Sequence, residues 1–211
     1  MRASVLRVSL CAALLALVAV PAQAQDAPVS RLPLISDEPT DPLLKQLFDE
    51  TRARGGKILN LHRTQGLAPK LAKARRDLAY AIRFETKLPA ALREMAIIRT
   101  SQILDSEYER NQHIPLAKVC GVTDAQLGAL EAWESSNLFD DKARSMLRYV
   151  EAMILAGGEI DDEIFAALSK QFSPQEIVEI TIIVGNYFAT GLLTKALKVK
   201  VDPPGAVPGK C

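Results

Sequence analysis

Apolar residues at helical spacing, separated by helix-capping residues, restrict the fold of this chain more than any other feature. Residues 43–48 carry four apolar side chains at helical spacing. Thr123 with Gln126, and Ser173 with Glu176, match capping boxes, in which two side chains satisfy backbone donors at a helix start. No convincing pair of alternating apolar and polar segments indicates strands. The sequence therefore predicts an all-α fold, a single helical domain of about seven to eight helices.

The chain divides into four segments. Residues 1–24 have a basic start, an apolar run and a final Ala-Gln-Ala, which is typical of a signal peptide cleaved after Ala24. Residues 25–40 are rich in Pro, Asp and Ser and predict an extended lead-in. Residues 41–200 form the predicted helical domain, and residues 201–211 form a predicted flexible tail. We therefore expect export, to the periplasm or to the medium.

The charge balance argues against two classes of partner. The chain has 26 Lys and Arg against 25 Asp and Glu, a formal net charge of +1, with no basic cluster typical of nucleic-acid binding. After the signal peptide, no stretch approaches about 18 uninterrupted apolar residues, so we expect no membrane partner after cleavage. Cleavage leaves Cys120 and Cys211, which could pair with each other, pair between chains or stay free.

One helix should present three polar side chains on a single face. Ser106, Glu109 and His113 are spaced i, i+3 and i+7, so they align along that face. Glu94 lies in the preceding helix, among apolar residues. Burial raises the pKa of a carboxyl group unless a cation or hydrogen bonds stabilise its charge. Such a carboxyl beside an imidazole could act as a general acid or base near neutral pH.

Two other interpretations of these residues must be weighed. In the first, Glu94 pairs with Arg93, Arg99 or Arg110 and His113 is a core histidine with satisfied hydrogen bonds. In the second, the carboxylates and the imidazole bind a metal ion. Because only one His is available at this site, we expect no metal and no cofactor.

A family resemblance extends these observations. The chain contains, in order, Leu88-Pro89, Leu-Arg-Glu-Met-Ala-Ile-Ile-Arg at 92–99, Glu-Tyr-Glu at 107–109, Asn-Gln-His at 111–113, and Gly121. In order and spacing these segments resemble the carboxymuconolactone decarboxylase family, whose superfamily also contains alkylhydroperoxidase D-like proteins. The resemblance covers roughly residues 40–200 and is most specific over residues 88–122. It implies the all-helical alkylhydroperoxidase D-like fold.

The peroxidase branch of this superfamily carries the motif Cys-x-x-Cys-x-x-x-His and an upstream Glu. Glu94 and His113 match that motif, but Ser106 and Glu109 stand at its two Cys positions. A thiolate is the group that attacks a peroxide, and neither a hydroxyl nor a carboxylate replaces it. The resemblance therefore favours the decarboxylase branch, with a peroxiredoxin-type antioxidant or a non-catalytic oligomeric binding module as alternatives.

The resemblance also implies roles for individual residues. It implies acid/base chemistry, a decarboxylation or isomerisation of a small lactone or unsaturated carboxylic acid, at Glu94, His113 and Glu109. We expect the substrate-binding residues to be Ser106, Tyr108, Arg99, Arg110 and Tyr187. Arg99 or Arg110 would hold a substrate carboxylate through two parallel hydrogen bonds. The family further implies a homo-oligomer, a trimer or a hexamer.

Overall fold

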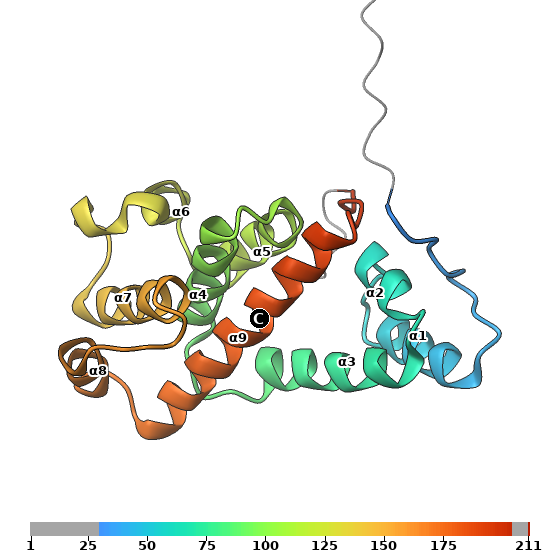
Figure 1. The fold of residues 1–211 in the computed structure, drawn as a ribbon, viewed down its shortest axis with the longest axis horizontal. Coiled ribbons are helices and arrows are strands. Elements are labelled where there is room, and N and C mark those ends of the chain that lie inside the picture. Colours follow the sequence, from blue (N-terminus) through green and yellow to red (C-terminus); the bar gives the residue numbers. More distant parts are fainter. Residues whose placement is uncertain (1–29, 204–210) are drawn as a thin grey trace, which may run out of the picture.

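The structure, a computed structural model, describes residues 30–203 and Cys211. The predicted signal peptide lies outside the described residues. Helices are the only regular elements in the described part of the chain, which confirms the all-α prediction (Figure 1). The helices are α1 (Pro42–Ala53), α2 (Asn60–Gln65), α3 (Pro69–Phe84), α4 (Ala90–Ile103), α5 (Glu107–Val119), α6 (Asp124–Ala129), the 3₁₀ helix η1 (Leu130–Ser135), α7 (Asp141–Leu155), α8 (Asp162–Ser169) and α9 (Pro174–Ala196).

Helix starts follow the capping residues that the sequence shows. The Asp41 side chain accepts a hydrogen bond from the Leu44 backbone N–H, 3.0 Å away, and Pro42 occupies the first position of α1. Both capping boxes form, at Thr123 before α6 and at Ser173 before α9. The described residues contain more helices than the seven to eight predicted because α2, α6 and η1 are each only six residues long.

Helix α4 lies at the centre of the fold. It packs against α5, α7 and α9, and most of its side chains are buried, which is typical of a helix enclosed on all sides (Figure 1). The largest apolar core surrounds it, whereas a smaller cluster of Leu44, Leu47, Phe48 and Ala72 joins α1 to α3. Two charged residues, Arg93 and Glu94, are therefore held inside the main core.

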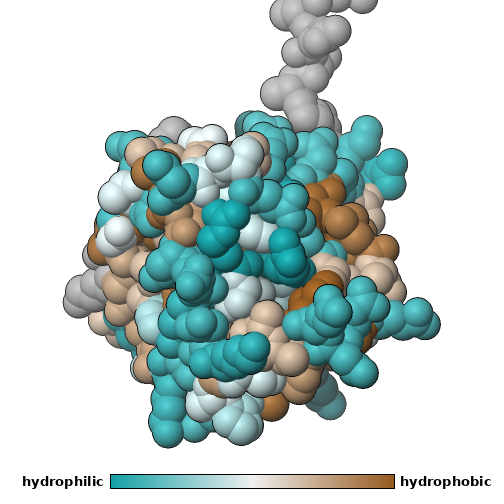
Figure 2. Space-filling model, turned by 90° about the vertical axis from the view of Figure 1, so that its left-hand side faces the viewer, coloured by the Kyte–Doolittle hydropathy of each residue, from teal (hydrophilic) through white to brown (hydrophobic). Residues whose placement is uncertain are grey.

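Helix α9 separates the two parts of the molecule. In Figure 1 it runs between α1–α3 on one side and α4–α8 on the other. In length and composition α9 could cross a membrane, the one helix among the described residues of which this holds. Its contacts with α4, α5, α7 and α8 give a second reason for an apolar sequence, because these neighbours bury one side of it. The face of the molecule formed by α6–α8, on the left in Figure 1, is mostly hydrophilic (Figure 2).

The described part of the C-terminal tail, residues 201–203 and Cys211, is anchored, while residues 204–210 of the predicted flexible tail lie outside the described residues. Asp202 is 7% exposed. Its carboxylate accepts hydrogen bonds from the Tyr108 hydroxyl at 2.6 Å and from the Asn60 backbone N–H at 2.9 Å. Cys211 forms a disulfide with Cys120, which settles the pairing that the sequence left open. Both anchors attach the tail to α5 or to its C-terminal end.

Candidate functional site

A cavity of about 280 Å³ lies between α2–α3 and the central helices α4, α5 and α9. It contains Glu94 from α4, Glu109 and His113 from α5, and Tyr187 from α9 among its lining residues. Ligand pockets in proteins are commonly somewhat larger than this, so the volume suits a small ligand. The three predicted catalytic residues thus line one cavity.

Glu94 and His113 form a direct pair. The Glu94 Oε2 atom lies 2.8 Å from His113 Nδ1, and the Glu94 side chain is almost fully buried. The other carboxylate oxygen accepts a hydrogen bond from Arg93 Nε at 3.1 Å. Because an ionised Glu94 is an acceptor only, the hydrogen-bond network assigns the proton to Nδ1. His113 Nε2 is then the nitrogen available to a ligand.

The charge of Glu94 is stabilised by a cation and by hydrogen bonds, which is the exception to a raised pKa that the sequence left open. Burial opposes ionisation, but the imidazole of His113 and the guanidinium of Arg93 together hold the pKa of Glu94 below its ordinary value. Arg93 also donates to the Arg83 backbone carbonyl at 2.9 Å. Of the three arginines considered as partners of Glu94, the structure selects Arg93. Glu94 therefore contacts His113 through one carboxylate oxygen and Arg93 through the other.

Glu109 behaves differently from Glu94. Its Oε2 atom is 3.7 Å from His113 Nε2, and the residue is 3% exposed. Its Oε1 atom is buried and has no hydrogen-bond partner among the described residues. Burial raises the pKa of Glu109, and the nearby charges of His113 and Arg75 only partly oppose this effect. Two carboxyl groups on opposite sides of one imidazole thus have opposite shifts in pKa.

The two tyrosines differ in how they meet the cavity. The Tyr187 ring stands edge-on to the His113 ring, with ring centroids 4.8 Å apart. Burial raises the pKa of its hydroxyl, so Tyr187 is neutral at physiological pH. Tyr108 also lines the cavity, but its hydroxyl donates to Asp202 and accepts from the Leu61 backbone N–H at 3.2 Å. The Tyr108 hydroxyl is therefore committed to anchoring the tail.

Three of the predicted substrate-binding residues do not line the cavity. Arg99 pairs with Glu151 at 2.7 Å, and Arg110 pairs with Asp105 at 2.9 Å. The Ser106 hydroxyl is buried 3.4 Å from Thr194 Oγ1, between α5 and α9. These three side chains contribute to helix packing.

The cavity has cationic residues that the sequence analysis missed. Arg75 and Arg83 line it from α3, eight residues apart and therefore on similar sides of that helix. Arg75 Nη2 donates to Thr190 Oγ1 at 2.5 Å, while its Nε is buried without a hydrogen-bond partner among the described residues. The eight-residue spacing of Arg75 and Arg83 is visible in the sequence, but the sequence does not show that α3 faces α5.

No cluster of three or more His, Cys, Asp or Glu side chains suited to a metal ion occurs in residues 30–203 or at Cys211. The ionisable groups of the cavity instead form a chain from Arg93 through Glu94 and His113 to Glu109. This arrangement can hold a proton on Glu109 and accept one on His113 Nε2. It is suited to proton transfer between a ligand and two nearby groups.

Opposite shifts in pKa predict opposite effects on stability. The lowered pKa of Glu94 contributes stability above its unfolded-state pKa, and this contribution is lost as the pH falls through the folded-state value. The raised pKa of Glu109 contributes stability only at low pH, and this contribution is lost as the pH rises through the folded-state value. We therefore expect Glu94→Gln to lower the free energy of unfolding at pH 7 and Glu109→Gln to raise it.

Urea unfolding at pH 7 and at pH 4 tests this pair of variants. Loss of one partner from a buried ion pair costs about 3–5 kcal/mol, which sets the scale for Glu94→Gln. The gain from Glu109→Gln should shrink toward zero at pH 4, where the wild-type carboxyl is protonated. Equal signs for the two variants at pH 7 would contradict the assigned charges.

Comparisons with known proteins relate this helical fold to a known family. Residues 69–152 match the carboxymuconolactone decarboxylase family. This match, over less than half of the chain, and the similar fold of two peroxidase-related proteins both support a relationship to the carboxymuconolactone decarboxylase and alkylhydroperoxidase D-like superfamily. The matched residues include α4 and α5, which carry the Glu94–His113 pair.

Individual relatives are distant. The chain is 27% identical over 95 residues to the uncharacterized protein YnjA of Escherichia coli K12, a match that covers 45% of this chain and 52%, about half, of that relative. A peroxidase-related protein of Ralstonia eutropha JMP134, described as an alkylhydroperoxidase AhpD core, has a similar fold, with a TM-score of 0.73, 19% identity and coverage of 86% of this chain and 98% of that one. The debrominase Bmp8, in complex with 2,3,4-tribromopyrrole, also has a similar fold. Its TM-score is 0.66 at 20% identity, and the match covers 84% of this chain and 93% of that one. At these identities the solved structures show a shared fold.

Proposed function

We propose that this protein is an acid/base catalyst that decarboxylates or isomerises a small lactone or unsaturated carboxylic acid. One observation carries the proposal: His113 Nε2 and the Glu109 carboxyl face each other across 3.7 Å inside a small cavity. Glu94 holds Nδ1 from the other side, so the reactive nitrogen has a fixed orientation. Groups with separated proton affinities are suited to act as acid and base.

In a decarboxylation, the bond between a carbon atom and its carboxylate breaks and carbon dioxide leaves. The electron pair passes into the adjacent unsaturated carbonyl system of the substrate, and that carbon or a conjugated one then takes up a proton. Glu109, whose raised pKa favours the protonated form, supplies this proton. In an isomerisation, His113 Nε2 removes a proton from one carbon and Glu109 protonates another.

Arg75 is suited to bind a negatively charged oxygen of the substrate. Its Nε is a buried donor without a hydrogen-bond partner among the described residues, and a guanidinium binds a carboxylate or an enolate oxygen well. The bound oxygen should be one that the substrate keeps, because an ion pair with the departing carboxylate would favour the ground state. Arg75 thus takes the role that the sequence analysis gave to Arg99 or Arg110.

A peroxidase is a weaker alternative, although a solved structure of similar fold is described as an alkylhydroperoxidase core. Ser106 and Glu109 stand where the two sulfurs of that chemistry would be. A non-catalytic binding module remains the third candidate. Nothing in the cavity specifically favours it.

A substrate panel tests the proposal. Full-length protein is incubated with small lactones and with unsaturated mono- and dicarboxylic acids, while carbon dioxide release and proton NMR spectra are recorded. We expect turnover of at least one carboxylate-bearing compound. Peroxide consumption in the presence of a dithiol is measured in parallel. Peroxide turnover without carbon dioxide release or double-bond migration would overturn the proposal in favour of the peroxidase.

Export is part of the proposal. It is supported by the signal-peptide pattern of residues 1–24 and by the disulfide, since such bonds persist mainly in oxidising compartments. In cell fractionation, we expect the mature protein in the periplasm or the medium, with Gln25 as its first residue. A cytoplasmic protein that keeps residues 1–24 would contradict this assignment.

The protein is further proposed to form a homo-oligomer, a trimer or a hexamer, through an apolar face of α9. Val178, Ile182 and Leu192 are all about half exposed, and Gly185 and Ala189 lie between them. These five positions alternate steps of four and three residues, the spacing by which two helices pack along a shared seam. Helix α9 of a second copy of this chain presents the same spacing, so we propose that it packs against this face.

Sedimentation velocity checks this assembly. We expect Ile182→Glu to convert the oligomer into a monomer, because the new carboxylate would be buried in an apolar contact. Leu155→Glu is the matched control, since Leu155 is also exposed and apolar but ends α7. A monomeric wild-type protein, or an unchanged oligomer in Ile182→Glu, would refute this surface.

A further inference from the structure

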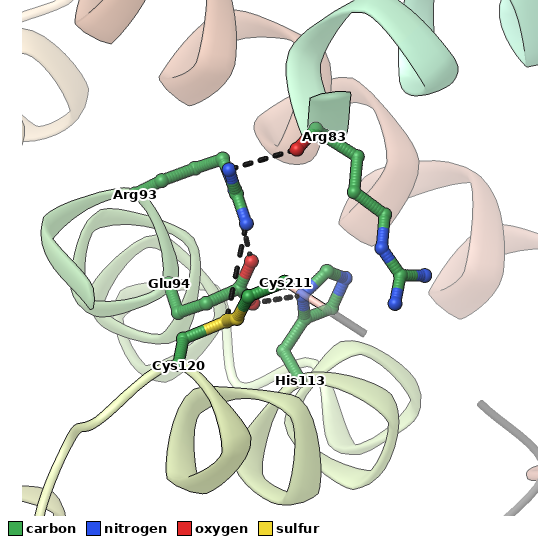
Figure 3. Close-up of a disulfide and its surroundings, with 6 residues drawn as sticks. All are labelled: Arg83, Arg93, Glu94, His113, Cys120 and Cys211. Atoms are coloured by element: carbon green, nitrogen blue, oxygen red, sulfur yellow. Dashed lines mark hydrogen bonds and ion pairs between the residues drawn. A yellow bond between two sulfur atoms is a disulfide. The ribbon is translucent and has the colours of Figure 1, made fainter. Parts of the chain in front are cut away.

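The disulfide between Cys120 and Cys211 lies beside the ionisable chain of the cavity. Cys120 follows α5 directly, and its Cα atom is 5.4 Å from that of Cys211. Arg93 Nη2 is 3.9 Å from Cys120 Sγ, while Arg93 Nε contacts Glu94. Figure 3 shows the disulfide, Arg93, Glu94 and His113 as one continuous group. One guanidinium therefore touches both the disulfide and the carboxylate that orients His113.

The two sulfur-bearing residues differ in exposure and in surroundings. Cys211 is exposed, whereas Cys120 is partly buried. Arg93 is 3% exposed, so its positive charge is little screened by solvent where it meets Cys120. A buried guanidinium favours a thiolate over a thiol. The site thus offers the sulfur of an exposed residue for attack and a cation-stabilised sulfur as the leaving group.

We propose that the Cys120–Cys211 pair is a thiol-reducible site whose redox state is transmitted through Arg93 to the Glu94–His113 pair. The reductant is a thiol, either a small dithiol or the exposed dithiol of a reducing protein. This assigns a function to two cysteines that lie outside the cavity lining. The effect of this redox site on catalysis rests on the proposed function, but the existence of the redox site does not.

The exchange proceeds in two balanced steps. A reductant thiolate attacks the Cys211 sulfur, a mixed disulfide forms, and the bond to Cys120 breaks with Cys120 leaving as a thiolate beside Arg93. A second thiolate of the reductant then attacks the mixed disulfide, which releases Cys211 and oxidised reductant. Two electrons pass from two reductant thiols to the disulfide. Stabilisation of the leaving thiolate accelerates the first step.

Reduction changes the charge that Arg93 meets. In the disulfide form its negatively charged neighbour is Glu94. In the reduced form the Cys120 thiolate is a second anion on the same guanidinium, so Arg93 stabilises Glu94 less. The other ionisable groups near Glu94 have the same covalent form in both states: Arg83, His113 and Tyr187, which are coupled to Glu94, and Glu109, which is coupled to His113. The hydrogen bond between Glu94 and His113 should therefore respond to reduction.

The first measurement follows reduction of the folded protein. Oxidised full-length protein is treated with dithiothreitol at pH 7, trapped with iodoacetamide and weighed by mass spectrometry, while circular dichroism follows the helices. We expect reduction to add two labelled cysteines, Cys120 and Cys211, to the label already carried by Cys11, with the helical signal retained. A disulfide that becomes reducible only after unfolding would overturn the proposal.

The second measurement observes His113 directly, at one fixed pH. The chain has two histidines, His62 and His113. In a carbon–proton NMR spectrum, the ring signal that disappears in His113→Gln therefore belongs to His113. We expect the His113 signal to shift on reduction of the wild-type protein. Cys211→Ser keeps the Cys120 thiol and should show the reduced position without any reductant. Cys120→Ser also lacks the disulfide but cannot form the thiolate, and should show the oxidised position.

These two variants separate the thiolate from simple release of the tail, because both release it. If Cys120→Ser takes the reduced position, or if the wild-type signal stays in place after complete labelling, transmission through Arg93 is refuted. No substrate is required. An inactive protein with the expected NMR pattern would count against the proposed reaction only.

Discussion

His113→Gln lowers turnover by about 10²–10⁴-fold, the usual contribution of a positioned acid or base. Gln can fill the space and donate to Glu94, but it cannot accept a proton at the position of Nε2. The loss should appear in kcat, because binding through Arg75 is left in place. Carbon dioxide release from a panel substrate is the measurement.

Two matched substitutions accompany this variant. Arg110→Gln changes a residue on the same helix that pairs with Asp105 outside the cavity, and should keep turnover within a few-fold of wild type. Glu94→Gln removes the anion that orients His113 and should lose activity as well. Turnover that survives both His113→Gln and Glu94→Gln would refute the catalytic assignment.

Cys211→Ser lowers the free energy of unfolding by about 4 kcal/mol. The disulfide joins residues separated by 91 positions, and closure of so long a loop removes much of the conformational entropy of the unfolded chain. Urea unfolding followed by circular dichroism measures the change. An ordinary domain has about 5–15 kcal/mol of stability, so the variant should remain folded.

Reduced wild-type protein provides the control for Cys211→Ser, because it lacks the same bond without any substitution. Both should have the same urea midpoint within error. A loss below about 1 kcal/mol would show that the bond adds little constraint to the unfolded chain. A large difference between the two samples would point to an effect of the serine itself.

Much of the fold could be predicted because the signals are local. Asp41 and the capping boxes at Thr123 and Ser173 act within one helical turn, and their geometry in the structure is as expected. The Glu94–His113 pair could also be predicted, since the family spacing relates two adjacent helices. The short helices α2 and α6 lack a long apolar pattern and were harder to count.

The rest depended on contacts between distant segments. Arg99 shares a helix with Glu94, but five residues place the two side chains on different sides of it, and Arg99 meets Glu151 instead. Arg75 lies on α3, and only the packing of α3 across the cavity brings it near Glu109. The lowered pKa of Glu94 likewise required the position of Arg93, which sequence proximity alone did not select.

The disulfide also divides the chain into an arm and a ring. Residues 120–211 are closed covalently, so α6, η1, α7, α8 and α9 lie in a ring, while α1–α5 precede it. A protease that cuts once inside the ring opens it without releasing a fragment, and the nicked protein keeps its full mass until the disulfide is reduced. One cut between α1 and α2 releases the N-terminal piece from covalent attachment. The two parts of the chain therefore differ in what a single backbone break can remove.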